Sequence, residues 1–219
     1  MGKNYIIAVD GPAGSGKSTI ARMVAEKLNY LYIDTGAMYR ALTLKALKTN
    51  ISLDDPLKLI KLAQTTDIKF ESQNNTLKIL LDSNDVTTQI REPQVTRNVV
   101  HLANIPEVRE IMVELQRSLG KDGGVVVEGR DITTVVFPNA QRKFYLDANF
   151  EERVQRRYRQ LIAEGKNISK EGLAQDMRNR DISDKQREVG ALRKAEDAIY
   201  LDTSDLSINE VIEKVISYV

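Results

Sequence analysis

The chain has 219 residues, which is enough for one large α/β domain with a small insertion. Its 32 Lys and Arg residues balance 31 Asp and Glu residues, so no overall basic field favours a nucleic-acid partner. The absence of cysteine excludes disulfides and thiol catalysis and suits a reducing compartment. The sequence has neither a signal-peptide pattern nor an apolar run near the roughly 18 residues of a membrane span, so we expect a cytoplasmic protein with no membrane partner.

The first predicted strand covers residues 5–9 and leads into the sequence GPAGSGKST, which fits the phosphate-loop pattern G-x-x-x-x-G-K-[ST]. Helical spacing of apolar residues follows over 20–28. A glycine loop between a strand and a helix directs backbone N–H groups at a phosphate, while Lys17 is expected to neutralise the β- and γ-phosphates and Ser18 to ligate Mg²⁺. We therefore predict a P-loop NTPase fold that binds a nucleoside triphosphate through Gly11, Pro12, Ala13, Gly14, Ser15, Gly16, Lys17, Ser18 and Thr19.

A second buried strand is predicted at 31–34, followed by a helix that opens at Thr35. The strand ends on Asp34, which is either a carboxylate of the functional site or only a cap for this helix. A further helix is expected to begin near Pro56.

The pattern changes at 67–92, where strands at 68–71 and 77–81 with a polar turn at 72–75 predict a β-hairpin, followed by a third short strand at 86–90. An antiparallel meander inside an alternating β/α chain indicates an inserted subdomain. Two helices are predicted next, at 93–103 and 106–119. His101 lies in the first of them and is expected to be structural, with no role in catalysis.

The β/α pattern then resumes, with strands predicted at 124–128, 143–147 and 199–201, which complete a five-stranded parallel sheet flanked by helices. Asn149 and Glu152 are expected to cap the helix after the fourth strand, and a charged helix runs from 170 to beyond 180. Ser207 and Glu210 are expected to cap a final helix whose buried stripe is Ile208, Val211, Ile212, Val215 and Ile216.

Ligands of an open parallel sheet bind beyond the carboxyl ends of its strands, where this chain carries the phosphate loop, Arg130 and Asp131. Arg153, Arg156 and Arg157 follow the fourth strand and have two readings. They form a solvated helix face that pairs with acidic neighbours, or a mobile cationic lid that excludes water from the reaction. The phosphate loop favours the lid, because phosphoryl transfer depends mainly on positioning and on well-placed cations.

These patterns predict a division into three parts. A core P-loop domain comprises 1–66, 93–149 and 190–219, and an Arg-rich lid with its helices comprises 150–189. The third part is the small antiparallel β insertion at 67–92, with adjoining helices to about 119.

Six segments in chain order resemble the bacterial cytidylate kinase family: DGPAGSGKS at 10–18, DTGAMYR at 34–40, GRD at 129–131 with VVFP at 135–138, LDA at 146–148 with the arginines after it, RDISDKQR at 180–187, and LDTS at 201–204. The resemblance covers essentially the whole chain. It implies a nucleoside monophosphate kinase with a five-stranded parallel core, a monophosphate-binding domain and a lid. Such an enzyme transfers the γ-phosphate of ATP, with Mg²⁺, to CMP or dCMP, in pyrimidine nucleotide metabolism.

The resemblance also implies roles for individual residues. Arg40 and Arg130 would hold the acceptor phosphate, and Arg180 and Asp184 would contact the sugar. Cytosine would be read by Thr35, Arg109, Asp131 and Arg187. With Arg157 acting from the lid, the implied catalytic residues are Lys17, Arg130, Arg157 and Arg180. Val100 departs from the family pattern, which has a serine of the base pocket at this position.

Two alternatives stay open on the sequence. One is a kinase for another monophosphate such as UMP, and the other is a nucleotide-binding switch. Neither N-K-x-D nor a D-x-x-G sequence after the second or third strand is found, which argues against a GTPase switch. The expected partners are ATP and CMP or dCMP, and the lack of a sustained heptad seam favours a monomer.

Overall fold

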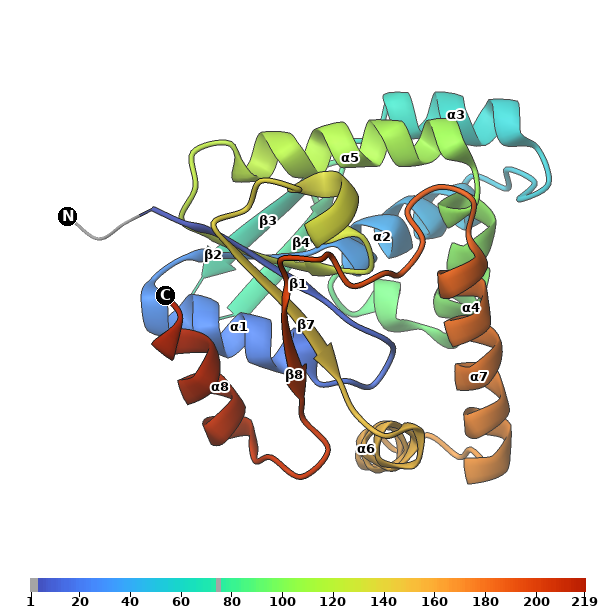
Figure 1. Cartoon of the computed structure of the whole chain (residues 1–219). Coiled ribbons are helices and arrows are strands. Elements are labelled where there is room, and N and C mark those ends of the chain that lie inside the picture. The colour runs from blue at the N-terminus through green and yellow to red at the C-terminus, as the bar shows by residue number, and fades with distance from the viewer. Residues whose placement is uncertain (1–3, 74–75) are drawn as a thin grey trace. The chain divides into compact units, whose positions relative to one another are not determined.

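The computed structural model describes residues 4–73 and 76–219. Its main sheet confirms the predicted five parallel strands, and their order is β2-β6-β1-β7-β8 (Figure 1). The strands of this sheet are β1 Ile6–Asp10, β2 Leu31–Asp34, β6 Val125–Gly129, β7 Arg142–Asp147 and β8 Ile199–Asp202.

The helices begin and end close to the predicted positions, because proline and polar caps mark many of their starts. No helix within the described ranges is long and apolar enough to cross a membrane. The helices are α1 Lys17–Leu28, α2 Thr35–Lys48, α3 Pro56–Gln64, α4 Pro93–Ala103, α5 Pro106–Gly120, α6 Phe150–Ala163, α7 Lys170–Gln186 and α8 Ile208–Ser217.

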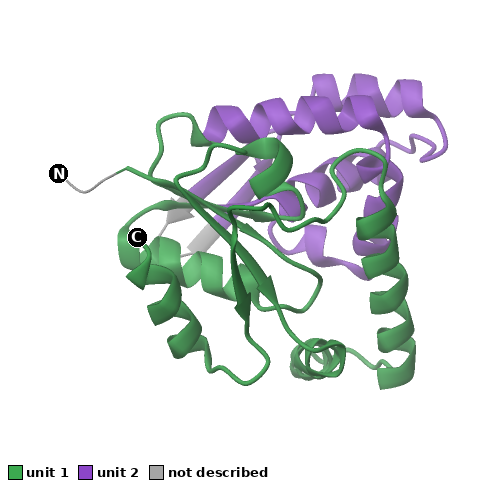
Figure 2. Ribbon diagram, in the orientation of Figure 1, with its two compact units in different colours: residues 1–32, 120–219 green, residues 33–119 purple. Residues whose placement is uncertain are grey.

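The chain divides into two compact units, which are residues 1–32 with 120–219, and residues 33–119 (Figure 2). Unit 1 contains the phosphate loop and most of the main sheet. Unit 2 contains α2 to α5 and a small antiparallel sheet, β3-β4-β5. The functional division into core, insertion and lid stays a prediction.

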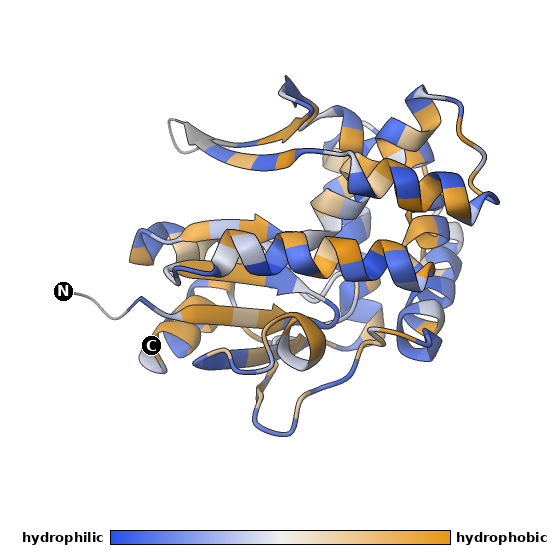
Figure 3. Ribbon diagram, turned by 90° about the horizontal axis from the view of Figure 1, so that it is seen from above, coloured by the Kyte–Doolittle hydropathy of each residue, from blue (hydrophilic) through white to orange (hydrophobic). Residues whose placement is uncertain are grey.

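The core of unit 1 forms between the sheet and the helices α1 and α8. The central strands β1 and β6 are apolar along most of their length, and the helices carry both apolar and polar residues (Figure 3). This difference follows from burial, since a central parallel strand is covered on both faces and a surface helix on one. The buried residues of this core are Ile7, Val9, Ile20, Ala21, Val24, Ala25, Val126, Phe144, Leu146, Val211, Ile212 and Val215.

The final helix agrees with its prediction except at one end of the apolar stripe. Ser207 and Glu210 form the predicted capping box, in which the serine hydroxyl accepts from the Glu210 N–H and the Glu210 side chain accepts from the Ser207 N–H. Ile208, however, is 51% exposed, because it is the first helical residue and precedes the turn that packs on the core.

In unit 2, the predicted hairpin is present as β3 Ile68–Gln73 and β4 Thr76–Leu81, paired antiparallel. Residues 74–75 of the predicted polar turn lie outside the described residues. The third strand predicted at 86–90 is wrong: β5 is Asn84–Asp85, and Ile90 lies in a short helical turn, η1 (Gln89–Arg91). Val86 and Ile90 are both buried four residues apart, and the Ile90 N–H donates to the Val86 carbonyl, which is helical and not strand spacing.

A second correction concerns the start of α6. Asn149 precedes this helix, but its side chain makes no capping hydrogen bond. Glu152 instead accepts from Arg156 Nε at 3.1 Å, one turn along the helix. The expected partner of Asn149 is therefore engaged elsewhere.

Asp10, at the end of β1, holds a turn that the sequence did not predict, the π-helical segment η2 (Ile132–Val136). Its buried carboxylate accepts from the N–H groups of Ile132 and Thr133, at 2.9 and 2.7 Å, and from the Thr133 hydroxyl at 2.6 Å. Burial raises the pKa of Asp10 to about 6, although these hydrogen bonds oppose the rise. Asp10 therefore ties the strand before the phosphate loop to the segment that follows Arg130 and Asp131.

The raised pKa of Asp10 predicts a pH dependence of stability. Between the ordinary value of 3.8 and the folded value of about 6, the folded protein keeps a proton that the unfolded chain releases. The contribution of Asp10 to the free energy of unfolding is thus fully present below about pH 4 and is lost as the pH rises through about 6. The difference between wild type and Asp10→Asn, which cannot titrate, should shrink by on the order of 2 kcal/mol from about pH 4.5 to about pH 7.5.

Urea denaturation at the two pH values measures this difference. Asp85→Asn is the matched control, because the hydrogen bonds from Thr87 lower the pKa of Asp85, so that its contribution is lost in the opposite direction, as the pH falls. A wild-type advantage over Asp10→Asn that grows towards neutral pH would contradict the assignment.

Candidate active site

The phosphate loop lies between β1 and α1, as the sequence predicts. Gly16 is the residue before α1 and has φ 87°, a left-handed conformation that glycine adopts without strain. Glycine has no side chain that could cap the helix, so no N-cap side chain accepts from the first N–H groups of α1. A helix N-terminus of this kind attracts an anion.

Three carbonyl groups of the loop accept hydrogen bonds from side chains of unit 1. A carbonyl and the N–H of the next residue share one planar peptide and point in opposite directions. Fixing the carbonyls on the outside therefore fixes the N–H groups on the inside, which forms a concave site for an anion. The pairs are Pro12 O with Lys17 Nζ (3.1 Å), Ala13 O with Arg153 Nη1 (2.9 Å) and Ser15 O with Thr203 Oγ1 (3.2 Å).

The first glycine of the loop is required by its neighbour on β7. A Cβ on Gly11 would overlap the carbonyl oxygen of Leu146. Backbone atoms cannot rotate out of the way as a flexible side chain can. Gly11 therefore lets the loop start directly against the sheet.

Lys17 is buried in a positively charged surrounding. Its Nζ lies 3.9 Å from Glu128 Oε2, and the other oxygen of Glu128 accepts from the Tyr32 hydroxyl at 3.0 Å. Burial and the neighbouring charge of Arg130 lower the pKa of Lys17 to about 7, while Glu128 acts in the opposite sense. The positive charges of Lys17 and Arg130 are ones that the phosphates of a nucleotide would neutralise.

Four of the predicted acceptor-side residues form one electrostatic cluster in unit 1. Arg130 Nε donates to Asp184 Oδ2 at 2.7 Å, and Arg187 Nη2 donates to Asp184 Oδ1 at 2.9 Å. Burial alone would raise the pKa of Asp184, but the charges of Arg130 and Arg180 hold it below its ordinary value. The charge of Arg180 also lowers the pKa of Lys17, which links this cluster to the phosphate loop.

Asp131 is buried at the carboxyl end of β6, beside this cluster in sequence. Its side chain makes no capping hydrogen bond to η2, the segment that follows it. Its backbone carbonyl instead accepts from the N–H groups of Val135 and Val136.

The three arginines at the start of α6 differ in their partners. Arg156 pairs with Glu152, as the surface reading predicts, and also donates to the Thr203 and Ser204 carbonyls at 2.6 and 3.2 Å. Arg157 Nη1 donates to Gln160 Oε1 at 2.7 Å on the same helix. Arg153 is buried and bonded to the phosphate loop. The three arginines are neighbours in the sequence but lie in different environments.

In unit 2, Asp34 accepts from the Ala37 N–H at 2.8 Å and from Arg40 Nη2 at 2.9 Å. Asp34 therefore caps α2 and also orients Arg40. The Nε of Arg40 is buried and has no hydrogen-bond partner among the described residues. A buried donor in this state is costly, which indicates a ligand as its partner.

The other predicted residues of unit 2 lie on three helices. Thr35 is buried at the first position of α2, and the buried Arg109 of α5 lies over the Tyr39 ring at 5.6 Å. Val100 is exposed on α4. The neighbouring His101 side chain is also exposed, with Nδ1 3.9 Å from Asp54, so it is not part of the core.

Sequence reasoning named Arg153 only as a lid arginine, and it assigned no site role to three residues that support the site: Glu128, Asp181 and Thr203. Glu128 had a recognisable signal, because a carboxylate that ends a buried β-branched strand has to be paired. The others had none, since their partners lie far away in the sequence.

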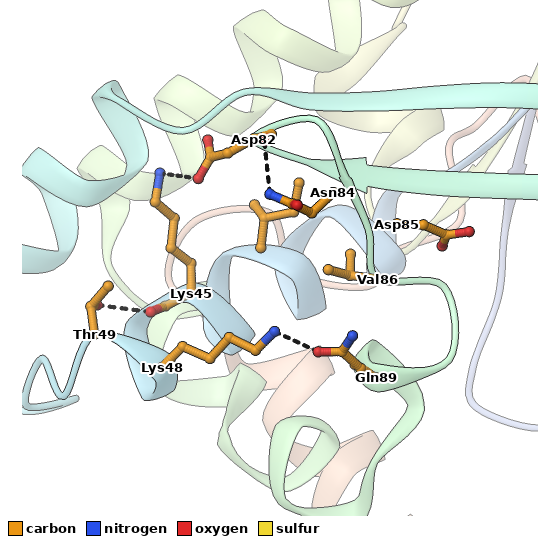
Figure 4. Close-up of a pocket in the computed structure, with 9 residues that line it drawn as sticks. Lys45, Lys48, Thr49, Asp82, Asn84, Asp85, Val86 and Gln89 are labelled. Carbon is orange, nitrogen blue, oxygen red and sulfur yellow. Dashed lines mark hydrogen bonds and ion pairs between the residues drawn. The ribbon is translucent and has the colours of Figure 1, made fainter.

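A surface hollow of about 460 Å³ lies in unit 2, between α2, the end of β4, β5 and η1 (Figure 4). Lys45 pairs with Asp82 at 2.7 Å, and Lys48 donates to Gln89. Because these charged and polar groups satisfy one another, we assign no ligand to the hollow.

The donor set of the protein fits a magnesium ion that arrives with a nucleotide. Within residues 4–73 and 76–219, no group of three or more His, Cys, Asp or Glu side chains is arranged to hold a metal. Mg²⁺ commonly takes few protein ligands and completes its shell with phosphate oxygens and water. The exposed hydroxyl-bearing Ser18, next to Lys17 at the start of α1, fits that role.

Comparison with known proteins gives a consistent result. The family model described as cytidylate kinase matches residues 7–219. Curated cytidylate kinases from Desulforamulus reducens and Bacillus subtilis are 48% and 47% identical over the whole chain and 98% of their own length. A solved structure of an uncharacterized protein from Eubacterium ventriosum has a TM-score of 0.51 at 12% identity, over 98% of this chain and 97% of that chain, and so shows a similar fold.

The contact between Gly11 and β7 gives a prediction with a built-in control. Gly11→Ala should weaken binding of a non-hydrolysable ATP analogue by about tenfold or more, because the loop or β7 must move to admit the Cβ. Gly165→Ala is the control: this glycine has φ 73°, but a Cβ there meets open space, so stability should fall by about 1 kcal/mol without a change in affinity. Calorimetric titration and thermal unfolding measure the two effects. Equal affinities for the two variants would refute the prediction.

Proposed function

Because the chain belongs to the cytidylate kinase family, we propose that it transfers the γ-phosphoryl group of ATP to CMP or dCMP, giving ADP and CDP or dCDP. The observation that carries this proposal is the full-length family match, which includes the phosphate loop and the cluster around Arg130. Family membership makes the chain a kinase, and the particular acceptor is the part that needs a test.

On the donor side, residues 11–19 bind the triphosphate through the inward N–H groups of the loop. Lys17 exchanges its contact with the Pro12 carbonyl for the β- and γ-phosphate oxygens. Ser18 would hold Mg²⁺ together with phosphate oxygens, and the ion would neutralise charge on the phosphates.

In the transfer step, a phosphate oxygen of the acceptor forms a bond to the γ-phosphorus as the bond to the β-phosphate oxygen breaks. Negative charge shifts to the leaving ADP, and fixed cations near these oxygens lower the barrier. Lys17, Arg130 and Arg180 are suited to this work, since they influence one another electrostatically without any ligand. Arg157 would join them from the lid.

On the acceptor side, Arg40 and Arg130 would hold the monophosphate, and the buried Nε of Arg40 supports this role. Asp131 would accept from the exocyclic amine of cytosine, a donor that uracil lacks. The remaining base contacts would come from Thr35, Arg109 and Arg187, and the sugar contacts from Arg180 and Asp184.

The proposal also includes the finer expectations of the sequence. The core, insertion and lid divide the work among donor binding, monophosphate binding and closure, and a protein of this function acts as a monomer in the cytoplasm on free nucleotides, without nucleic acid or membrane.

A coupled assay of ADP release tests the proposal with ATP, Mg²⁺ and each of CMP, dCMP, UMP, AMP and GMP in turn. CMP and dCMP should each give acceptor-dependent ADP release, confirmed as CDP or dCDP by chromatography. Lys17→Ala is the control and should remove turnover while the circular dichroism spectrum is retained. If no acceptor accelerates ADP release, the nucleotide-binding switch is the hypothesis that remains. A preference for UMP would make the cytosine assignment wrong.

Asp131→Asn tests the base reader. The variant loses the negative acceptor for the cytosine amine, so the KM for CMP should rise by about tenfold or more while the KM for ATP changes by less than about twofold. Steady-state kinetics with each substrate varied in turn give both values. An equal loss for both substrates would remove Asp131 from the base site.

A further inference from the structure

We propose that Arg153 and Asp181 form a positioning pair for the phosphate loop: Arg153, oriented by Asp181, fixes the Ala13 carbonyl and thereby the direction of the next N–H group in the loop. This inference rests on the proposed function only in taking ATP as the donor. It assigns no contact with either substrate to the two residues.

The guanidinium of Arg153 joins three parts of unit 1. Nη1 donates to the Ala13 carbonyl at 2.9 Å and to Asp181 Oδ2, on α7, at 2.7 Å. Nε donates to the Ala148 carbonyl, just after β7, at 3.1 Å. The group also lies over the Phe150 ring, with 5.2 Å between the guanidinium carbon and the ring centroid. These contacts fix the plane of the guanidinium on several sides.

The geometry of the peptide carries this order into the binding site. The Ala13 carbonyl and the Gly14 N–H belong to one planar peptide and point in opposite directions. An Arg153 that holds the carbonyl outside therefore holds the N–H towards the anion site. The glycine after Ala13 has φ 78° and adds little stiffness of its own, so the peptide depends on an external partner.

The pair is difficult to explain by stability alone. Both residues are buried, and the second carboxylate oxygen, Asp181 Oδ1, has no hydrogen-bond partner among the described residues. Burying two charges costs about as much as their attraction returns, and an oxygen without a partner adds to the cost. We therefore infer that the pair fixes the geometry of the loop and adds little to the stability of the fold.

Asp181 lies on α7, the helix that also carries residues proposed to bind the acceptor. It follows Arg180 directly, and Asp184 comes one turn later on α7. Lysine at position 153 would keep the charge but would present no planar fork for the Ala13 carbonyl, the Ala148 carbonyl and Asp181 together. The arginine, and not just its charge, is therefore required.

The test measures binding of a non-hydrolysable ATP analogue with Mg²⁺ to the full chain, without any acceptor, alongside the melting temperature. Arg153→Lys should weaken binding by about tenfold, and the near-isosteric Asp181→Asn by about three- to tenfold. The double variant should bind no more than about twofold less tightly than Arg153→Lys, because both changes break one connection.

Asp197→Ala is the matched control for loss of an ion pair. It removes the partner of the buried Lys143, with which Asp197 pairs at 2.6 Å in the same unit. It should lower the melting temperature yet leave affinity within about twofold of wild type. In turnover, Arg153→Lys should raise the KM for ATP while the KM for CMP stays within about twofold.

Three outcomes would overturn the proposal. They are unchanged affinity in both single variants, losses that multiply in the double variant, and a loss in Asp197→Ala as large as in Arg153→Lys. Binding of the analogue requires no acceptor and no turnover. If the chain makes no CDP, the proposed function is refuted, but the binding test of Arg153 and Asp181 still gives a result.

Discussion

The candidate active site depends on a constraint of the peptide bond: a backbone N–H can be aimed inwards only if the carbonyl on the same peptide is held outwards. A glycine-rich loop has little conformational preference of its own and cannot meet this condition alone. In this chain the carbonyls of Pro12, Ala13 and Ser15 receive donors from α1, α6 and the segment after β8. The loop is short, but the structure that shapes it extends through most of unit 1.

The same supports also concentrate charge. Lys17 lies near Glu128, and Arg130 is bonded to Asp184, so each cation has an acidic neighbour before any nucleotide binds. Burial is the main cause of the lowered pKa of Lys17, and the charge of Arg130 adds to it. A site whose cations are already held in place needs little rearrangement to receive phosphate groups, which is the condition under which electrostatic stabilisation is most effective.

Much of this fold is legible in the sequence because its signals are local. The phosphate loop is a short contiguous pattern, the β-branched run at 125–127 identifies a central strand, and Ser207 with Glu210 marks a helix start. The two errors in the fold arose where one local interaction competed with another, four residues away along the chain. Glu152 was engaged by Arg156, and Ile90 followed the helical spacing set by Val86.

In the site, residues placed by neighbouring sequence could be predicted, and contacts between residues far apart in the sequence could not. Lys17 and Asp131 are placed by the strands and loops that carry them, and the resemblance to a family named further residues. The contacts of Arg153 and Thr203 with the loop could not be predicted, since 140 and 188 positions separate them from the loop residues that they support. A sequence gives the identity of a donor, but only the tertiary structure reveals which acceptor lies in front of it.

The hydrogen bonds of Asp10 to Ile132 and Thr133 have a consequence for engineering of this enzyme. They brace the turn that begins just after Asp131, so a designer who alters that acidic position works on a rigid platform attached to the first strand. Libraries that vary the base pocket should therefore preserve threonine at 133, because without its hydroxyl the platform loosens and new specificities would arise on a mobile backbone. The side chain at position 131 can be exchanged freely only while the hydrogen bonds of Asp10 to Ile132 and Thr133 are retained.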